Sequence, residues 1–171
     1  MPLTDDDIAA DLRKAGLHFV ARVEGEVREP LPKTGGPASC GPEDGRFDSP
    51  PVAGDDPDFA EKVNSDWCRM ATEYGLLDDD REFLLRVYYD VSNGADPGSW
   101  VQVRLDGEWD FIGPETATLR SGFAGLFTRR YVPEFTMLSL DGRAMLNTTV
   151  WGNGTVSTIV IRPDRLDGST T

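Results

Sequence analysis

The most constraining feature of this chain is a set of three short runs, between residues 135 and 161, that are rich in apolar residues and separated by turn residues. The runs cover residues 135–140, 144–150 and 156–161, and the turn residues Asp141-Gly142 and Gly-Asn-Gly at 152–154 separate them. Short apolar runs bounded by turn residues indicate strands, and short glycine-containing turns join neighbouring antiparallel strands. We therefore expect a three-stranded antiparallel meander in this part of the chain.

The pattern of apolar residues earlier in the chain predicts four more strands. Residues 17–23 carry apolar side chains at every second position, whereas residues 83–89 are apolar on both faces, as in a central strand. Residues 100–105 continue the pattern, and Asp106-Gly107 is a hairpin signal after which residues 109–112 are expected to return as a strand.

Helical spacing of apolar residues predicts two helices and indicates a third. Thr4 and Asp7 have the spacing of a capping box ahead of a helix over residues 5–15. Residues 58–74 carry one apolar stripe and form the longest predicted helix, and residues 119–127 repeat the spacing less regularly.

These elements together predict an α+β fold with a single domain over residues 1–162. A curved, mainly antiparallel sheet of about seven strands would carry two or three helices on one face. Residues 30–57 contain seven prolines and five glycines, and we expect a long loop there. Residues 163–171 are expected to form a flexible tail.

The composition excludes several kinds of function. Thirty acidic and seventeen basic residues give a net charge of −13, which disfavours binding to nucleic acid or to an anionic membrane. No run approaches the roughly 18 apolar residues of a membrane helix, and no secretory signal is recognisable, so the expected location is the cytoplasm. The arginine-rich base content suggests a bacterial source.

The inventory of reactive residues is small. His18 is the only histidine, and Cys40 and Cys68 are the only cysteines, without the spacing of a zinc site. No nucleophile elbow, phosphate-binding loop or dinucleotide fingerprint occurs. We therefore expect no cofactor and no metal and assign no catalytic residue, which favours a non-enzyme without deciding the question. Two free thiols in a reducing compartment are the expected state, with one disulfide as the alternative.

Residues 100–110 are the candidate partner-binding site, because they combine aromatic side chains with carboxylates. Tryptophan anchors interfaces, and carboxylates steer a basic partner toward them. In the alternative interpretation the tryptophans belong to the core and the acids protect a sheet edge. The candidates are Trp100, Asp106, Glu108, Trp109 and Asp110.

A second set of residues would suit a pocket between a curved sheet and a helix. Its members are Tyr88, Tyr131, Thr148 and Trp151, and ordinary cross-strand packing is the alternative explanation.

Two functional hypotheses follow from these observations. The first is a non-enzymatic binding module, immunity-like or adaptor-like, whose acidic surface engages a basic partner protein. The second is a small-molecule-binding domain, or a cofactor-independent isomerase or cyclase, with a cone-shaped pocket.

Overall fold

The described part of the chain folds into one antiparallel sheet with two α-helices. The computed structural model describes residues 1–31, 36–90, 92, 95–111 and 135–166 of the 171. The helices are α1 (Asp5–Arg13) and α2 (Phe59–Glu73). The strands are β1 (Leu17–Arg22), β2 (Arg46–Asp48), β3 (Val52–Ala53), β4 (Glu82–Val87), β5 (Ser99–Leu105), β6 (Thr136–Leu138), β7 (Met145–Val150) and β8 (Thr155–Ile161).

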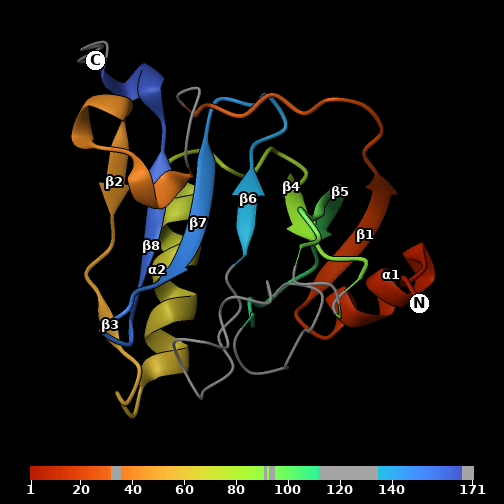
Figure 1. Ribbon diagram of the computed structural model, residues 1–171, viewed down its shortest axis with the longest axis horizontal. Coiled ribbons are helices and arrows are strands. Elements are labelled where there is room, and N and C mark those ends of the chain that lie inside the picture. The colour runs from red at the N-terminus through yellow and green to blue at the C-terminus, as the bar shows by residue number, and fades with distance from the viewer. Residues whose placement is uncertain (32–35, 91, 93–94, 112–134, 167–171) are drawn as a thin grey trace.

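The sheet is open and has the strand order β1-β5-β4-β6-β7-β8-β2, with β3 also paired to β8 (Figure 1). Every strand pair in the described residues is antiparallel. The predicted meander is confirmed as β6, β7 and β8, and β4 is confirmed as a central strand between β5 and β6. The α+β prediction is therefore confirmed.

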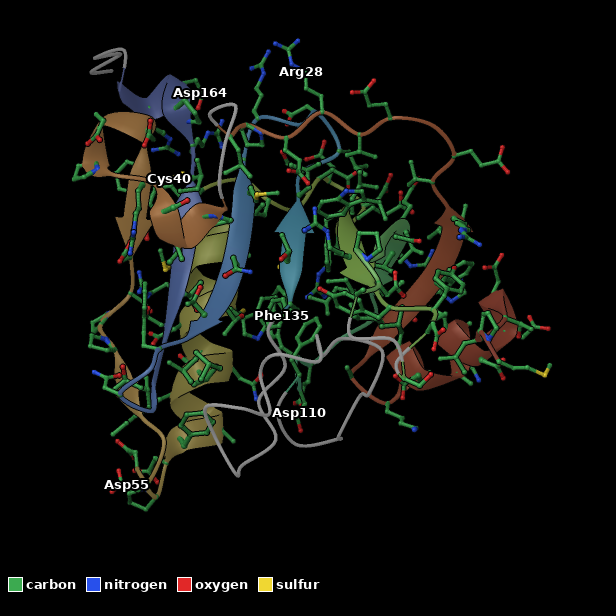
Figure 2. All side chains as sticks on the ribbon, viewed as in Figure 1. Arg28, Cys40, Asp55, Asp110, Phe135 and Asp164 are labelled. Carbon is green, nitrogen blue, oxygen red and sulfur yellow. The ribbon has the colours of Figure 1, made fainter. Side chains whose placement is uncertain are left out.

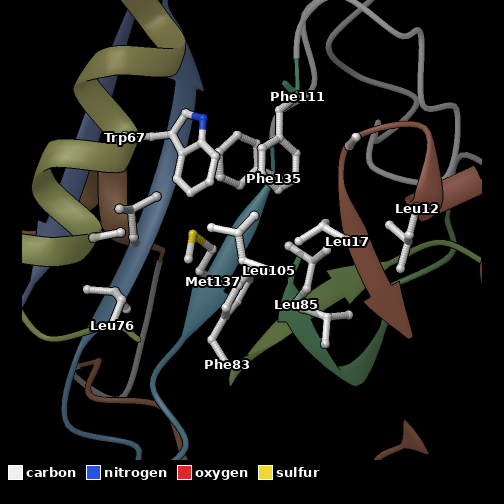
Figure 3. Close-up of a cluster of buried hydrophobic side chains, with 14 of the residues drawn as sticks. Leu12, Leu17, Trp67, Leu76, Phe83, Leu85, Leu105, Phe111, Phe135 and Met137 are labelled. Carbon is white, nitrogen blue, oxygen red and sulfur yellow. The ribbon is translucent and has the colours of Figure 1, made fainter. Parts of the chain in front are cut away.

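Both helices pack on the same face of the sheet and form the main core with it (Figure 3). Ile8 and Leu12 of α1 and Trp67 of α2 are fully buried in this core, against Phe83 and Leu85 of β4. Alternate residues of a strand point to one face, so the odd-numbered apolar residues of β4 and β5 supply the floor. The prediction that the helices cover one face is confirmed for α1 and α2, and the third predicted helix lies outside the described residues.

Local sequence explains where the first helix begins. The Thr4 hydroxyl accepts a hydrogen bond from the Asp7 amide at 3.3 Å, and the Asp7 carboxylate accepts one from the Thr4 amide at 2.8 Å. This reciprocal arrangement is the predicted capping box, which satisfies amides that a helix start leaves free.

The opposite face of the sheet carries a second, smaller apolar cluster. Cys40 and Leu31, with Val27, come from the segment between β1 and β2 and pack against strand residues that include Leu138 and Ile159. In Figure 1 this segment runs along one end of the sheet from β1 and ends over β7 and β8. It thus covers only part of that face.

The predicted long loop at residues 30–57 is more structured than its composition indicates. It contains 3₁₀ turns at Pro37–Ser39 and Pro42–Asp44, and then β2 and β3, which both pair with β8. Strands of three and two residues are too short to show a period of two, so the pattern could not reveal them.

The predicted hairpin after β5 is wrong. β5 pairs with β4 along one edge and with β1 along the other, so neither edge is free for a returning strand. The residues after Asp106 leave the sheet instead. The Asp106 amide donates to the Gly16 carbonyl at 2.9 Å, which ties this segment to the connection between α1 and β1.

The first four residues of the expected flexible tail, 163–166, have defined structure instead, and residues 167–171 lie outside the described residues. Pro163–Leu166 forms a 3₁₀ turn next to the end of α2. Arg162 donates to the Tyr74 carbonyl, and Arg165 donates to the Glu73 carbonyl at 3.2 Å. Cations at a helix C-terminus satisfy unpaired carbonyls and oppose the negative end of the helix dipole.

We predict that Arg162→Ala destabilises the protein by about 1–2 kcal/mol, because it removes a half-buried charge-assisted cap of α2. The melting temperature should fall by about 2–8 °C, measured by calorimetry. Arg143→Ala, which removes an exposed arginine outside the ion pairs of the described residues, is the control and should leave it nearly unchanged. Equal melting temperatures for the two variants would contradict the capping role.

Candidate functional site

The structure does not bring the two predicted tryptophan anchors together. Trp100 on β5 belongs to the cluster on the face away from the helices, where the Arg86 guanidinium lies 4.7 Å from its ring centre. Trp109 packs on the helix side, with its ring centre 4.0 Å from that of Trp67 in an edge-to-face arrangement. The sheet therefore separates them, and both are only half-buried.

The three predicted carboxylates lie in the turn after β5, which packs between the two helices. The Asn64 side chain on α2 donates to Asp110 at 3.1 Å and accepts from the Phe111 amide at 3.1 Å. Gly16, with a φ of +86°, permits the close approach, because a Cβ there would lie 2.5 Å from the Glu108 carbonyl oxygen. Asp106 pairs with Arg104 at 3.2 Å and, like Glu108 and Asp110, is exposed.

The residues of the predicted pocket lie on different faces. Thr148 is fully buried on the α2 side of β7, whereas Trp151 lies on the opposite face and donates to the Ser157 hydroxyl at 2.7 Å. Tyr88 follows β4 on that opposite face too, and Tyr131 lies outside the described residues. The sheet therefore separates Thr148 from Tyr88 and Trp151.

A groove with acidic walls, which the sequence pattern did not single out, runs between α2 and the segment before it. We call it the acidic groove; its volume is about 570 Å³. It is lined by Pro50, Pro51, Val52, Ala53, Asp56, Asp58, Glu61, Lys62, Ser65 and Asp66. The signal in the sequence is the density of acids at residues 55–66, which hold five carboxylates.

Two of the four carboxylates that line the acidic groove, Asp56 and Asp66, are in ion pairs, and the other two are not paired within the described residues. Its one base, Lys62, pairs with Asp56 at 2.6 Å, and this hydrogen bond lowers the pKa of Asp56 and raises that of Lys62. Asp58 is the N-cap residue of α2, yet its side chain makes no capping hydrogen bond. Within the described residues, no ion pair engages Asp58 or Glu61.

Asp66 is a partly buried carboxylate of the groove. Partial burial raises its pKa, and the Arg69 guanidinium, 3.8 Å away, opposes the rise. A carboxylate that has lost part of its hydration gains more from a cation than a fully solvated one does.

The acidic groove and the turn after β5 lie at the same end of the molecule. Figure 2 shows Asp55 and Asp110 at one end, with Arg28 and Asp164 at the other. Asn64, which holds Asp110, is on α2, and so are Glu61 and Asp66 of the groove. Acidic side chains therefore flank the first half of α2 on both sides.

A scan of the chain against protein-family models, a search of curated proteins and a search of solved structures each found no match. Neither helix in the described ranges has both the length and the apolar character needed to cross a bilayer. The same ranges hold no group of three or more His, Cys, Asp or Glu side chains placed to bind a metal ion. Cys40 and Cys68 are both free thiols.

The buried hydroxyl of Thr148 is expected to lower the stability of the folded protein. Its hydroxyl is buried, and in the part of the chain that the structure describes it has no hydrogen-bond partner. We predict that Thr148→Val, which keeps the shape and removes this hydroxyl, stabilises the protein by about 1 kcal/mol. Calorimetry should show a melting temperature higher by about 2–4 °C.

Thr136→Val is the matched control, because the Thr136 hydroxyl accepts a hydrogen bond from Asn147 at 2.9 Å. Replacing Thr136 with valine should lower the stability of the protein and its melting temperature, because this hydrogen bond is lost. If Thr148→Val also destabilises the protein, its hydroxyl has a partner that the structure does not show.

Proposed function

We propose that this protein is a non-enzymatic binding module, immunity-like or adaptor-like, that engages a basic partner protein through the acidic groove. The observation that carries the proposal is the charge around α2. Residues 55–73 hold six carboxylates against two bases, a local net charge of −4, and both bases are already paired with acids of the same segment.

The shape of the acidic groove supports a protein side chain as its occupant. Pro50 and Pro51 make a stiff wall with no amide hydrogen to offer, and α2 makes the other wall. A lysine or arginine lays its apolar stem along such a wall and brings its charge to the carboxylates. Asp58, Glu61 and Asp66 are the carboxylates that would receive it.

The acidic turn after β5 would act at longer range. Glu108 and Asp110 lie across α2 from the groove and are exposed to solvent. Exposed charges add little to affinity, but they speed the encounter with an oppositely charged protein. The cytoplasm is the compartment that this proposal assigns, and two free thiols are consistent with it.

We predict that the double variant Asp58→Asn, Glu61→Gln weakens binding of an arginine-rich peptide of about 12 residues by roughly fivefold or more, because it removes two unpaired groove charges. Isothermal titration calorimetry at about 0.02 M and about 0.2 M salt measures the affinity. Wild-type binding should weaken steeply between the two conditions.

The control is the double variant Glu24→Gln, Asp79→Asn, which changes the net charge by the same amount at exposed positions outside the groove. It should lose less than about twofold in affinity. Equal losses in the two double variants would show that only total charge matters and would reject the acidic groove as the binding site.

A further inference from the structure

A second recess lies on the face of the sheet opposite α1 and α2. It has a volume of about 320 Å³ and lies between the segment after β1 and strands β4, β6 and β7. The strands supply polar groups to this recess, and Tyr88, just after β4, adds another. The strand residues are Arg86, Thr136, Asn147 and Thr149. The volume is at the small end of the range for ligand sites.

Arg86 is held rigidly at one side of this recess. Its guanidinium lies 4.7 Å from the ring centre of Trp100, and its side chain is 28% exposed. Gly98, with a φ of +80°, lies against the stem of Arg86, where a Cβ would approach Cγ to 2.7 Å. A planar, preorganised guanidinium is the protein group best suited to bind a carboxylate with two hydrogen bonds.

The polar residues on the strands are already ordered by one another. Asn147 donates to Thr136 at 2.9 Å and to the Phe135 carbonyl at 3.3 Å, and Thr149 donates to the Asn147 amide oxygen. Thr136 and Thr149 are 7% and 9% exposed, so polar groups occupy positions where a covered sheet usually places apolar ones. Within the described residues the Thr136 hydroxyl accepts a hydrogen bond and donates none, so its hydrogen could be donated to a ligand acceptor.

Among the described residues, Glu29 is the only acid that lines this recess. Its carboxylate is bound to the Arg86 guanidinium. Arg86 Nη2 donates to Glu29 Oε1. Glu29 belongs to a segment without helix or strand, 57 residues away along the chain. A carboxylate on such a segment can be replaced at less cost than one on a strand, because no sheet hydrogen bonds have to break.

We propose that this recess binds a small carboxylic acid with an apolar body. In the free protein the Glu29 carboxylate occupies the position on Arg86 where the ligand's carboxylate would bind. The ligand's carboxylate would replace that of Glu29 at the Arg86 guanidinium. The body would lie against Leu31, Met145 and Ala38, which line the same recess. Binding would release the segment that carries Glu29.

The test compares hexanoate and benzoate with their uncharged analogues hexanamide and benzamide. Binding is followed by NMR on the Arg86 side-chain Nε–H signal and on backbone amides. We expect saturable binding of the acids at or below about 5 mM and none of the amides. Glu29→Gln should tighten acid binding about tenfold, as expected if the Glu29-bound form makes up about nine-tenths of the free protein.

Glu26→Gln is the matched control, because it removes the same charge from an exposed neighbour on the same segment and should leave the affinity unchanged. Arg86→Gln should abolish binding, and Arg86→Lys, which keeps the charge but loses the planar donor pair, should weaken it at least about tenfold. Circular dichroism checks that each variant is folded.

Three results would overturn the proposal: amides that bind as well as the acids, an affinity of Glu29→Gln equal to that of Glu26→Gln, or wild-type affinity in a folded Arg86 variant. If Arg86→Gln does not fold, two comparisons still test the proposal. They are the affinity of Glu29→Gln against that of Glu26→Gln, and the binding of the acids against that of the amides. This recess and the acidic groove lie on opposite faces of the sheet, so either proposal can fail without the other.

Discussion

The packing of Trp67 against three other aromatic side chains is the contact on which the rest of the fold depends. Its ring meets those of Trp109, Phe111 and Phe135 edge to face, with centres 4.0, 4.6 and 5.5 Å away. Phe135 leads into β6, and β6 joins the two halves of the sheet through two residue pairs with β4 and three with β7. So short a junction relies on side-chain packing, and Trp67 lies over it.

The same contact determines where the acidic side chains stand. With Trp67 turned into the core, the helical repeat places Glu61 and Asp66 on the outer faces of α2, toward Pro50 and Pro51. The packing of Trp109 and Phe111 on Trp67 places the turn after β5 on the other side of α2. There the Asn64 side chain donates a hydrogen bond to Asp110. The two acidic features therefore lie beside one helix because one aromatic cluster fixes both.

Local residue patterns predicted several parts of the fold correctly. The capping box, the stripe of α2 and the meander follow from local residue spacing, and all three are present. Strand partners are not local: Asp106-Gly107 has hairpin chemistry, but β1 already occupies the edge that a return strand would need. The polar positions of the second recess had a signal, since Arg86 follows three apolar residues of β4 and Asn147 begins a polar run in β7. One sequence does not show which face these positions share.

A net charge of −13 favours a basic partner and opposes the entry of an anion, so the two proposed sites need separate electrostatic arguments. A carboxylate about 4 Å from a half-buried guanidinium gains up to about 4 kcal/mol, taking an effective dielectric constant of about 20. A surface carboxylate about 20 Å away across water costs only about 0.2 kcal/mol, and physiological salt, with a screening length of about 8 Å, removes most of that. Arg86 therefore outweighs the distant acids, whereas Glu29, in direct contact with Arg86, is the one competitor whose charge is not screened.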